Sequence, residues 1–170
     1  SPIVATLGGV RQVVVLNQSS IAGHDPATGR VLWNHPWPRT MPSVAAPLVL
    51  SDTRVLLSVG DGIGSRLLEI SRDGDAVTQS LVWESTRLKA KFTNPVLHDG
   101  FVYGLDDGVL VCLDPADGER RWKGGRYGHG QTILAGNRLL LGQRPFECFQ
   151  CRVETIKGIV QFLCVNHVRP

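Results

Sequence analysis

The sequence has little that would suggest a membrane span, a nucleic-acid interface or a targeting signal. None of its apolar runs approaches the ~18 residues that a membrane-spanning helix requires, so we predict no membrane span. The formal net charge is only +3 and the basic residues are scattered, which argues against a nucleic-acid partner. Ser1 is neither a starting Met nor part of a secretory signal, so we expect it to be the edge of a processed or excerpted chain.

A long apolar stripe with the helical period is also lacking. Instead, 19 Gly and 10 Pro divide the chain into short apolar runs, at positions 13–16, 55–57, 101–103 and 139–141. Runs of this length bounded by Gly, Asp and Asn are typical of β-strands. Because 42% of the residues are hydrophobic and 19% are charged, the chain has a globular composition, and we predict an all-β fold.

A repeat is present. Segments 24–33 and 113–122 share Asp-Pro-Ala-(Thr/Asp)-Gly, and each ends in a Trp eight positions after the Asp. A degenerate copy, at 67–83, lies between them. The three tryptophans, Trp33, Trp83 and Trp122, are spaced by 50 and 39 positions, which is the length of one four-stranded propeller blade.

A second sequence pattern repeats together with the Asp-Pro-Ala-(Thr/Asp)-Gly motif. Segments 47–59, 95–103 and 132–141 each read as a short strand, a tight turn and a second strand, the pattern of a β-hairpin. Together the two repeated patterns predict a partial β-propeller of about three and a half four-stranded blades. We place the blades at about 1–40, 41–90 and 91–128, with the start of a fourth at 129–142.

The motif has a local physical meaning. Asp25 and Asp114 can accept backbone N–H bonds across their own turns, and Gly29 and Gly118 suit a positive φ. Each Trp then offers a large flat surface to the neighbouring blade. We therefore expect Trp122→Ala to destabilise the fold by ~3–5 kcal/mol, as for other buried aromatic truncations.

The pattern Asp-x-x-(Thr/Asp)-Gly-x-x-x-Trp resembles the tryptophan-docking repeat of propellers of the pyrroloquinoline-quinone (PQQ) type, over residues 1–142. This PQQ-like repeat family includes quinoprotein alcohol dehydrogenases and the outer-membrane assembly lipoprotein BamB, together with many bacterial repeat proteins. The resemblance implies a ring of about eight blades. We therefore expect part of a longer protein or a truncated gene, folded as an open arc.

The resemblance implies a non-enzymatic scaffold that binds a protein or peptide partner on a propeller face, with BamB-like outer-membrane assembly as one version. It also implies a periplasmic or other extracytoplasmic location. The alternative is a fragment of a PQQ-dependent quinoprotein alcohol dehydrogenase, which needs a base carboxylate, an ion such as Ca²⁺ and, in the matching enzymes, two adjacent Cys residues.

The sequence has no adjacent Cys pair. Its candidate carboxylates all fall at turns, where a structural role is expected: Asp25, Asp106, Asp107, Asp114 and Asp117. We therefore assign no catalytic, cofactor-binding or metal-binding residue and expect no cofactor.

Two glycine-rich segments suggest nucleotide loops without meeting their requirements. Residues 60–65 lack the third spaced Gly and a following helix, and residues 124–130 lack the Gly-Lys-(Ser/Thr) ending of a phosphate loop. We interpret 124–130 as an inter-blade linker on one propeller face. Arg126, Tyr127 and His129 are candidate ligand contacts there, because propeller function resides in face loops.

The tail at 143–170 departs from the repeat and holds three of the four Cys residues. Cys148, Cys151, Cys164 and His167 have a spacing compatible with a tetrahedral Zn²⁺ site. Two other hypotheses stay open, a foreign reading frame and a degenerate set of closing strands. Cys112 belongs to a blade strand and is expected to be a small buried hydrophobe.

Overall fold

The computed structural model describes the backbone of residues 1–37, 44–143, 147–156 and 159–168, and the side chains of residues 1–37 and 44–142. The described residues form sixteen strands. They are β1 (Ile3–Leu7), β2 (Val10–Leu16), β3 (Ser20–His24), β4 (Val31–Pro36), β5 (Leu48–Val49), β6 (Arg54–Val59), β7 (Gly64–Asp73), β8 (Ala76–Ser85), β9 (Val96–His98), β10 (Phe101–Asp106), β11 (Val109–Leu113), β12 (Arg120–Arg126), β13 (Gln131–Ala135), β14 (Arg138–Gln143), β15 (Glu147–Ile156) and β16 (Ile159–Val168).

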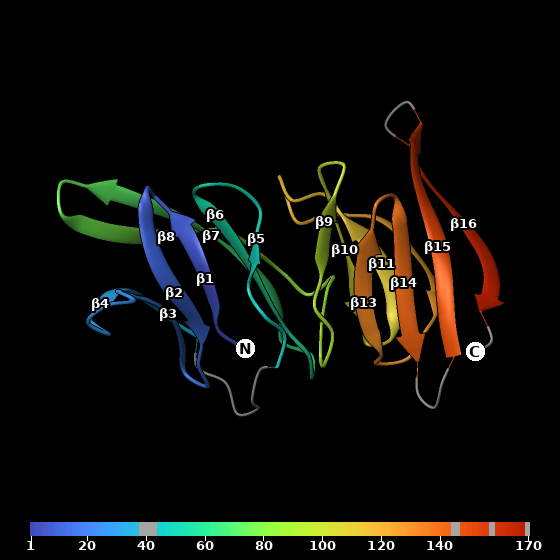
Figure 1. Cartoon of the computed structure of the whole chain (residues 1–170), viewed down its shortest axis with the longest axis horizontal. Coiled ribbons are helices and arrows are strands. Elements are labelled where there is room, and N and C mark those ends of the chain that lie inside the picture. Colours follow the sequence, from blue (N-terminus) through green and yellow to red (C-terminus); the bar gives the residue numbers. More distant parts are fainter. Residues whose placement is uncertain (38–43, 144–146, 157–158, 169–170) are drawn as a thin grey trace.

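The strands form four antiparallel sheets of four strands each, and within each sheet neighbours in sequence are neighbours in space. The sheets stand side by side in chain order, with the first and the fourth at opposite ends of the molecule (Figure 1). This arrangement is an open arc of stacked propeller blades. The predicted fold class, an all-β partial propeller with tryptophan-docking motifs, is confirmed.

The hydrophobic core lies between the blades rather than within one of them. One apolar cluster joins the first and second sheets, another the second and third, and another the third and fourth. Each contains one repeat tryptophan, Trp33, Trp83 or Trp122 in that order. A blade buries both faces only when it has neighbours, so the aromatic side chains fill the inter-blade gap as predicted.

A β-bulge precedes each of these tryptophans. In the first blade Gly23 pairs with Trp33 and His24 with Val31, so that Leu32 has no partner across the ladder. The same irregularity occurs at Val82 in the second blade and at Arg121 in the third. A bulge shifts the alternation of side chains by one position, which turns the Trp toward the following blade.

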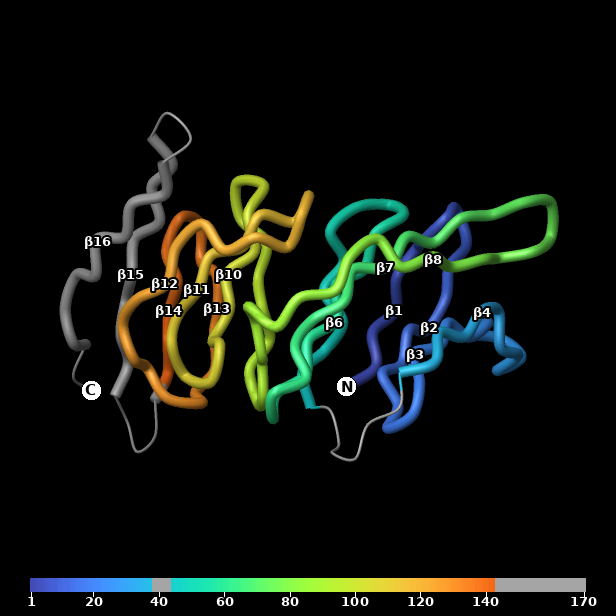
Figure 2. Tube along the Cα trace, turned by 180° about the vertical axis from the view of Figure 1, so that it is seen from behind, coloured from blue at the N-terminus to red at the C-terminus, as the bar shows by residue number. Residues whose placement is uncertain are grey.

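The second blade differs from its neighbours in its outer hairpin. β7 and β8 have 10 residues each, whereas β3 and β11 have five. The degenerate middle repeat therefore encodes a long β-hairpin instead of the Asp-Pro-Ala-x-Gly turn. This hairpin extends past the first sheet in both views of the molecule (Figures 1 and 2).

The tail pairs with the fourth sheet. β15 pairs with β14 over Glu147 to Arg152, and β16 pairs with β15. The segment expected to be the start of a fourth blade thus supplies the first two strands of a four-stranded sheet, the arrangement that the closing-strand hypothesis requires. The side chains of the predicted zinc ligands Cys148, Cys151, Cys164 and His167 lie outside the described residues, so this site stays a hypothesis.

Candidate protein-binding face

One end of the blades carries the connections that lead from each outermost strand to the next innermost strand. We call this end the linker face and define it by the β6–β7 turn (60–63), the β10–β11 turn (107–108) and the linkers 86–95 and 127–130. The linker 86–95 crosses from the outer edge of the second blade to the inner edge of the third. Loops that a rigid scaffold positions in this way commonly carry binding functions.

The first half of this linker is anchored to the second blade. Leu88 is fully buried and Ala90 is 1% exposed. The hydroxyls of Ser58 and Ser65 donate to the Leu88 carbonyl over 3.1 and 2.7 Å, and the Ala90 N–H donates to the Ser58 hydroxyl. Buried polar groups with partners of this kind fix a backbone in one conformation. The linker is therefore a preorganised element.

Asp106 ties the same linker to the third blade. Its carboxylate is 2% exposed and forms ion pairs with Lys89 of the linker and Lys123 of β12. The Lys89 backbone N–H also donates to it over 3.1 Å. Burial by itself raises the pKa of the carboxyl, but the hydrogen bonds and charges of the two lysines outweigh it and hold the pKa below its usual value. A structural role at a turn was predicted for Asp106; it ends β10 beside the β10–β11 turn, and its buried carboxylate is the centre of an ion triad with Lys89 and Lys123.

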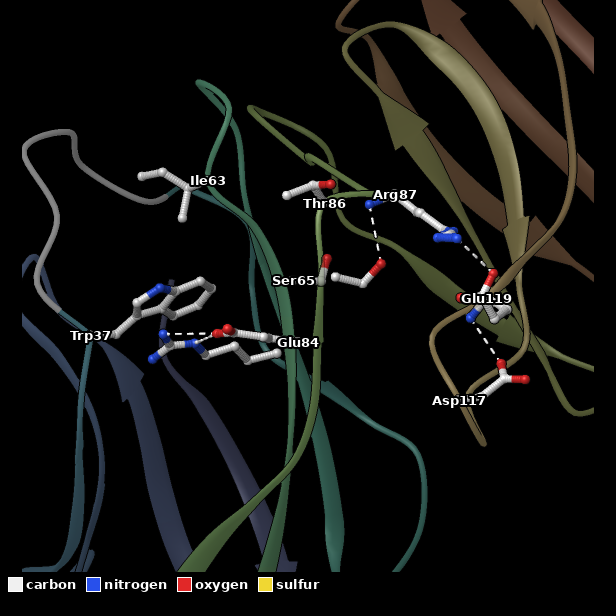
Figure 3. A pocket seen from close by; sticks show the side chains of 10 residues that line it. Trp37, Ile63, Ser65, Glu84, Thr86, Arg87, Asp117 and Glu119 are labelled. Atoms are coloured by element: carbon white, nitrogen blue, oxygen red, sulfur yellow. Dashed lines mark hydrogen bonds and ion pairs between the residues drawn. The ribbon is translucent and has the colours of Figure 1, made fainter.

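A pocket of about 450 Å³ opens between the start of the linker 86–95 and the β11–β12 turn (114–119) of the third blade (Figure 3). Trp37 and Glu84 lie on one side of it, and Arg87, Asp117 and Glu119 lie on the other (Figure 3). The remaining lining residues are Ile63, Ser65, Arg66, Ser85 and Thr86.

Each side of the pocket holds one charge pair. The Arg66 guanidinium lies 4.8 Å from the centroid of the Trp37 ring and donates to Glu84 over 3.1 Å. Across the pocket, Arg87 and Glu119 form an ion pair of 2.8 Å. Glu84 and Glu119 are 63% and 53% exposed, so their carboxylates are accessible to a bound molecule. Guanidinium, carboxylate and indole groups side by side suit a polypeptide segment, which carries complementary groups.

Phe92 forms an exposed aromatic patch on the inner half of the same linker. Its side chain is 46% exposed, with the Lys91 ammonium 5.7 Å from the ring centroid. The His129 ring meets it edge to face at a centroid distance of 6.4 Å. Gln131 donates to the Phe92 carbonyl over 2.9 Å, which holds the backbone beneath the exposed ring. An exposed aromatic on a fixed backbone is a common feature of protein-binding surfaces.

The three candidate contacts in the second glycine-rich segment have different positions. Arg126 ends β12 and is exposed, and His129 is exposed beside Phe92. Tyr127 is only 8% exposed and packs in the apolar cluster between the third and fourth blades, so it is a core residue and not a surface contact. Sequence analysis missed Phe92 as the neighbour of His129, because the two residues belong to different linkers.

The carboxylates of the repeated motif stabilise their own turns. Asp25 accepts the N–H groups of Ala27 and Thr28 over 2.8 and 2.9 Å, and these bonds hold its pKa below the usual value. The hydrogen bond from Arg121, followed by that from the Ala116 N–H, lowers the pKa of Asp114. These two carboxylates have the structural role that the sequence predicts.

Gln12 is the main structural residue that sequence analysis missed. It is fully buried and accepts the hydrogen bond of the Trp33 indole N–H. Its own amide donates to the carbonyls of Leu7 and Val10. A signal was present, since Gln12 occupies an inward position of β2 between the apolar Val10 and Val14.

Within the described side chains, no group of three or more His, Cys, Asp or Glu residues could hold a metal ion. Cys112 is a buried free thiol, and burial raises its pKa to about 11, which agrees with the expected role as a small hydrophobe. No helix among the residues that the structure describes has the length and apolarity needed to cross a membrane.

Meandering four-stranded sheets stacked face to face, each junction filled by a Trp that follows a bulge, define a β-propeller built from tryptophan-docking repeats. The chain belongs to the protein family described as outer membrane protein assembly factor BamB, which matches residues 1–124. A similar solved structure is that of BamB from Moraxella catarrhalis, with a TM-score of 0.57 and 17% sequence identity. That similarity covers 89% of this chain and 44% of the other, so the chain spans less than half the length of that structure. No curated protein matches the sequence.

Proposed function

We propose that this chain is a non-enzymatic scaffold module that binds a protein or peptide partner on its linker face. In this proposal it acts as a BamB-like factor in outer-membrane protein assembly, in the periplasm or another extracytoplasmic compartment. Membership of the BamB family supports the role and the location. The exposed side chains and fixed backbone of the linker face support binding of a partner there.

The observation that carries the proposal is the exposure of Phe92 on an immobilised linker. Phe92 is the only aromatic among the exposed large hydrophobic side chains of the described residues, and aromatic side chains are enriched at protein interfaces. The backbone on both sides of it is held by the Ser58–Ala90 and Gln131–Phe92 hydrogen bonds. Binding therefore orders little additional chain, which lowers the entropic cost of association.

The pocket at Arg66 and Arg87 extends this surface toward the outer edge. Its two guanidiniums are already paired with Glu84 and Glu119, so a partner meets alternating charges instead of a patch of one sign. Surfaces of this type give specificity of orientation more than raw affinity. The partner segment is thus expected to place an apolar side chain on Phe92 and polar groups in the pocket.

Site-specific photo-crosslinking in the full-length protein, in its native cells, tests the proposal. A photoreactive amino acid replaces Phe92 in one variant, Arg87 in a second and Arg30 in a third. Arg30 is exposed in the β3–β4 turn, at the opposite end of the strands from the linkers. We expect the same cross-linked protein at positions 92 and 87 and none at position 30.

Mass spectrometry of the cross-linked species identifies the partner, and fractionation of the same cells reports the compartment. Identical cross-links at all three positions, or none at any of them, would contradict a partner on the linker face. A purely cytoplasmic protein would contradict the proposed location.

A further inference from the structure

The outer edge of β8 is open. β8 is the last strand in the order β5-β6-β7-β8, so one side of its backbone points away from the sheet. Among the described residues, no backbone hydrogen bond joins β8 to any segment other than β7. Additional blades before or after this chain would stack on sheet faces, so they would leave this edge at the rim of the propeller.

The corresponding strands of the neighbouring blades are protected against edge pairing. β4 has only 6 residues and ends in Pro36, which lacks an N–H group. β12 has four basic residues, Arg120, Arg121, Lys123 and Arg126, among its 7 residues. Short length, proline and positive charge are the usual means by which proteins prevent edge-to-edge association.

β8 has none of these devices along most of its length. Its 10 residues contain no Pro, Lys or Arg, and its only charged residue is Glu84, next to the last position. The ladder with β7 is regular from Ala76 to Leu81, before the bulge at Val82. Leu81 and Val82 are 44% and 37% exposed, which adds apolar surface beside the open backbone groups.

We propose that β8 pairs antiparallel with β8 of a second copy, so that the two second blades form one continuous sheet across a two-fold axis. Such pairing places residues from the stretch 76–81 of one copy opposite residues of the same stretch in the other. Like charges directly opposite one another destabilise a strand pair, and this stretch contains no charge. The same pairing through β12 would juxtapose Arg and Lys side chains, so among the first three blades the second alone offers a self-complementary edge. A two-fold interface of this kind closes on itself and stops at a dimer.

Sedimentation of the full-length protein over a range of concentrations tests this inference. We expect a weak, concentration-dependent dimer, since a six-residue strand pair buries less than the ~1,200 Å² of a standard interface. Ser80→Lys places a positive charge on the edge of each copy and should weaken self-association about fivefold or more. Gln18→Lys adds the same charge in the exposed β2–β3 turn of the first blade, outside β8, and should leave self-association unchanged.

Hydrogen exchange provides a second measurement, because a dimer formed through another surface would not change the exchange rates of the β8 amides. The amides of residues 76–81 should exchange more slowly at high than at low protein concentration, and Ser80→Lys should abolish the difference. A protein that stays monomeric up to about 1 mM would overturn the inference. So would a dimer that Ser80→Lys leaves intact. Neither result bears on the linker face, since neither Ser80 nor the exchange readout reports on Phe92.

Discussion

The second and third blades share strand order and core chemistry, but their outer hairpins differ. In the third blade, Asp114 begins a short turn in which the Gly118 N–H donates to the Asp114 carbonyl over 2.9 Å and Gly118 has φ of 71°. In the second blade the strands continue to Asp73 and Ala76. The difference lies in one turn, yet it changes how the preceding blade docks its tryptophan.

Trp83 of the second blade docks on the turn of the third. Its indole N–H donates to the Pro115 carbonyl over 3.0 Å, and a Cβ at Gly118 would lie 2.7 Å from its Cε3 atom. Trp33 of the first blade lies in the apolar cluster that it shares with the second blade, whose β7–β8 hairpin has no such turn. Its N–H is satisfied by Gln12 of its own blade instead. The two tryptophans thus satisfy their indole N–H groups differently, Trp83 on the turn of the next blade and Trp33 within its own blade.

Truncation of Trp33 should have the largest effect on stability. Its side chain is 4% exposed, so Trp33→Ala should destabilise the fold by ~3–5 kcal/mol in urea unfolding, and it leaves the buried Gln12 side-chain oxygen without the indole N–H that donates to it. Trp122, which is partly buried, should lie at the lower end of the same range.

A double-mutant cycle shows whether Gln12 is present because of Trp33. Gln12→Leu removes the hydrogen bonds to the Leu7 and Val10 carbonyls in either background. In the wild-type background it also leaves the Trp33 indole N–H unpaired, so it should be more destabilising there than in the Trp33→Phe background. Equal effects in the two backgrounds would mean that the Gln12–Trp33 hydrogen bond does not explain the buried amide.

Loss of the Asp106 carboxylate should have the next largest effect on stability. Asp106→Asn leaves the ammonium groups of Lys89 and Lys123 without a counter-charge, and we expect a loss of about 2–3 kcal/mol. Because the folded pKa is lowered, the stabilisation is fully present above the unfolded value of about 3.9 and is lost as the pH falls through the folded pKa. The Asn variant should lose this part of the acid dependence. Asp61→Asn is the matched control in the corresponding turn of the second blade, where the Lys91–Asp61 pair is more exposed.

Much of this architecture could be predicted from the sequence because the repeat carries its own physical reasons. The Asp25 and Asp114 turns, the positive φ of Gly29 and Gly118 and the Trp at each junction follow from local chemistry. The hairpin of the second blade could not be recognised as such, since the degenerate copy shows the loss of a motif but not what replaces it. The surface at Phe92 and the pocket at Arg66 combine residues from separate blades, and no local pattern reports such proximity.

Two glycines with the same backbone conformation separate turn strain from Trp docking. Gly118 and Gly29 have φ of 71° and 73°, but a Cβ at Gly29 would meet nothing within 4 Å. Gly29→Ala should therefore cost about 1 kcal/mol for the left-handed backbone alone. Gly118→Ala adds the collision with Trp83 and should cost about 2–3 kcal/mol. Equal losses in urea unfolding would mean that Trp83 does not depend on contact with this turn.

The smallest effect is expected at the outer half of the long hairpin. Ser80 is exposed, and the main neighbours of β8 are β7 and β4, so Ser80→Lys should change the unfolding free energy of the monomer by less than about 0.5 kcal/mol. Urea unfolding at low protein concentration, where self-association is absent, provides the measurement. A larger loss would indicate that residues 76–81 contribute to the stability of the second blade itself. The length of β8 would then have an explanation within the monomer. A negligible loss would show that Ser80→Lys leaves the monomer undisturbed, so that its effect on self-association reports on the edge of β8 alone.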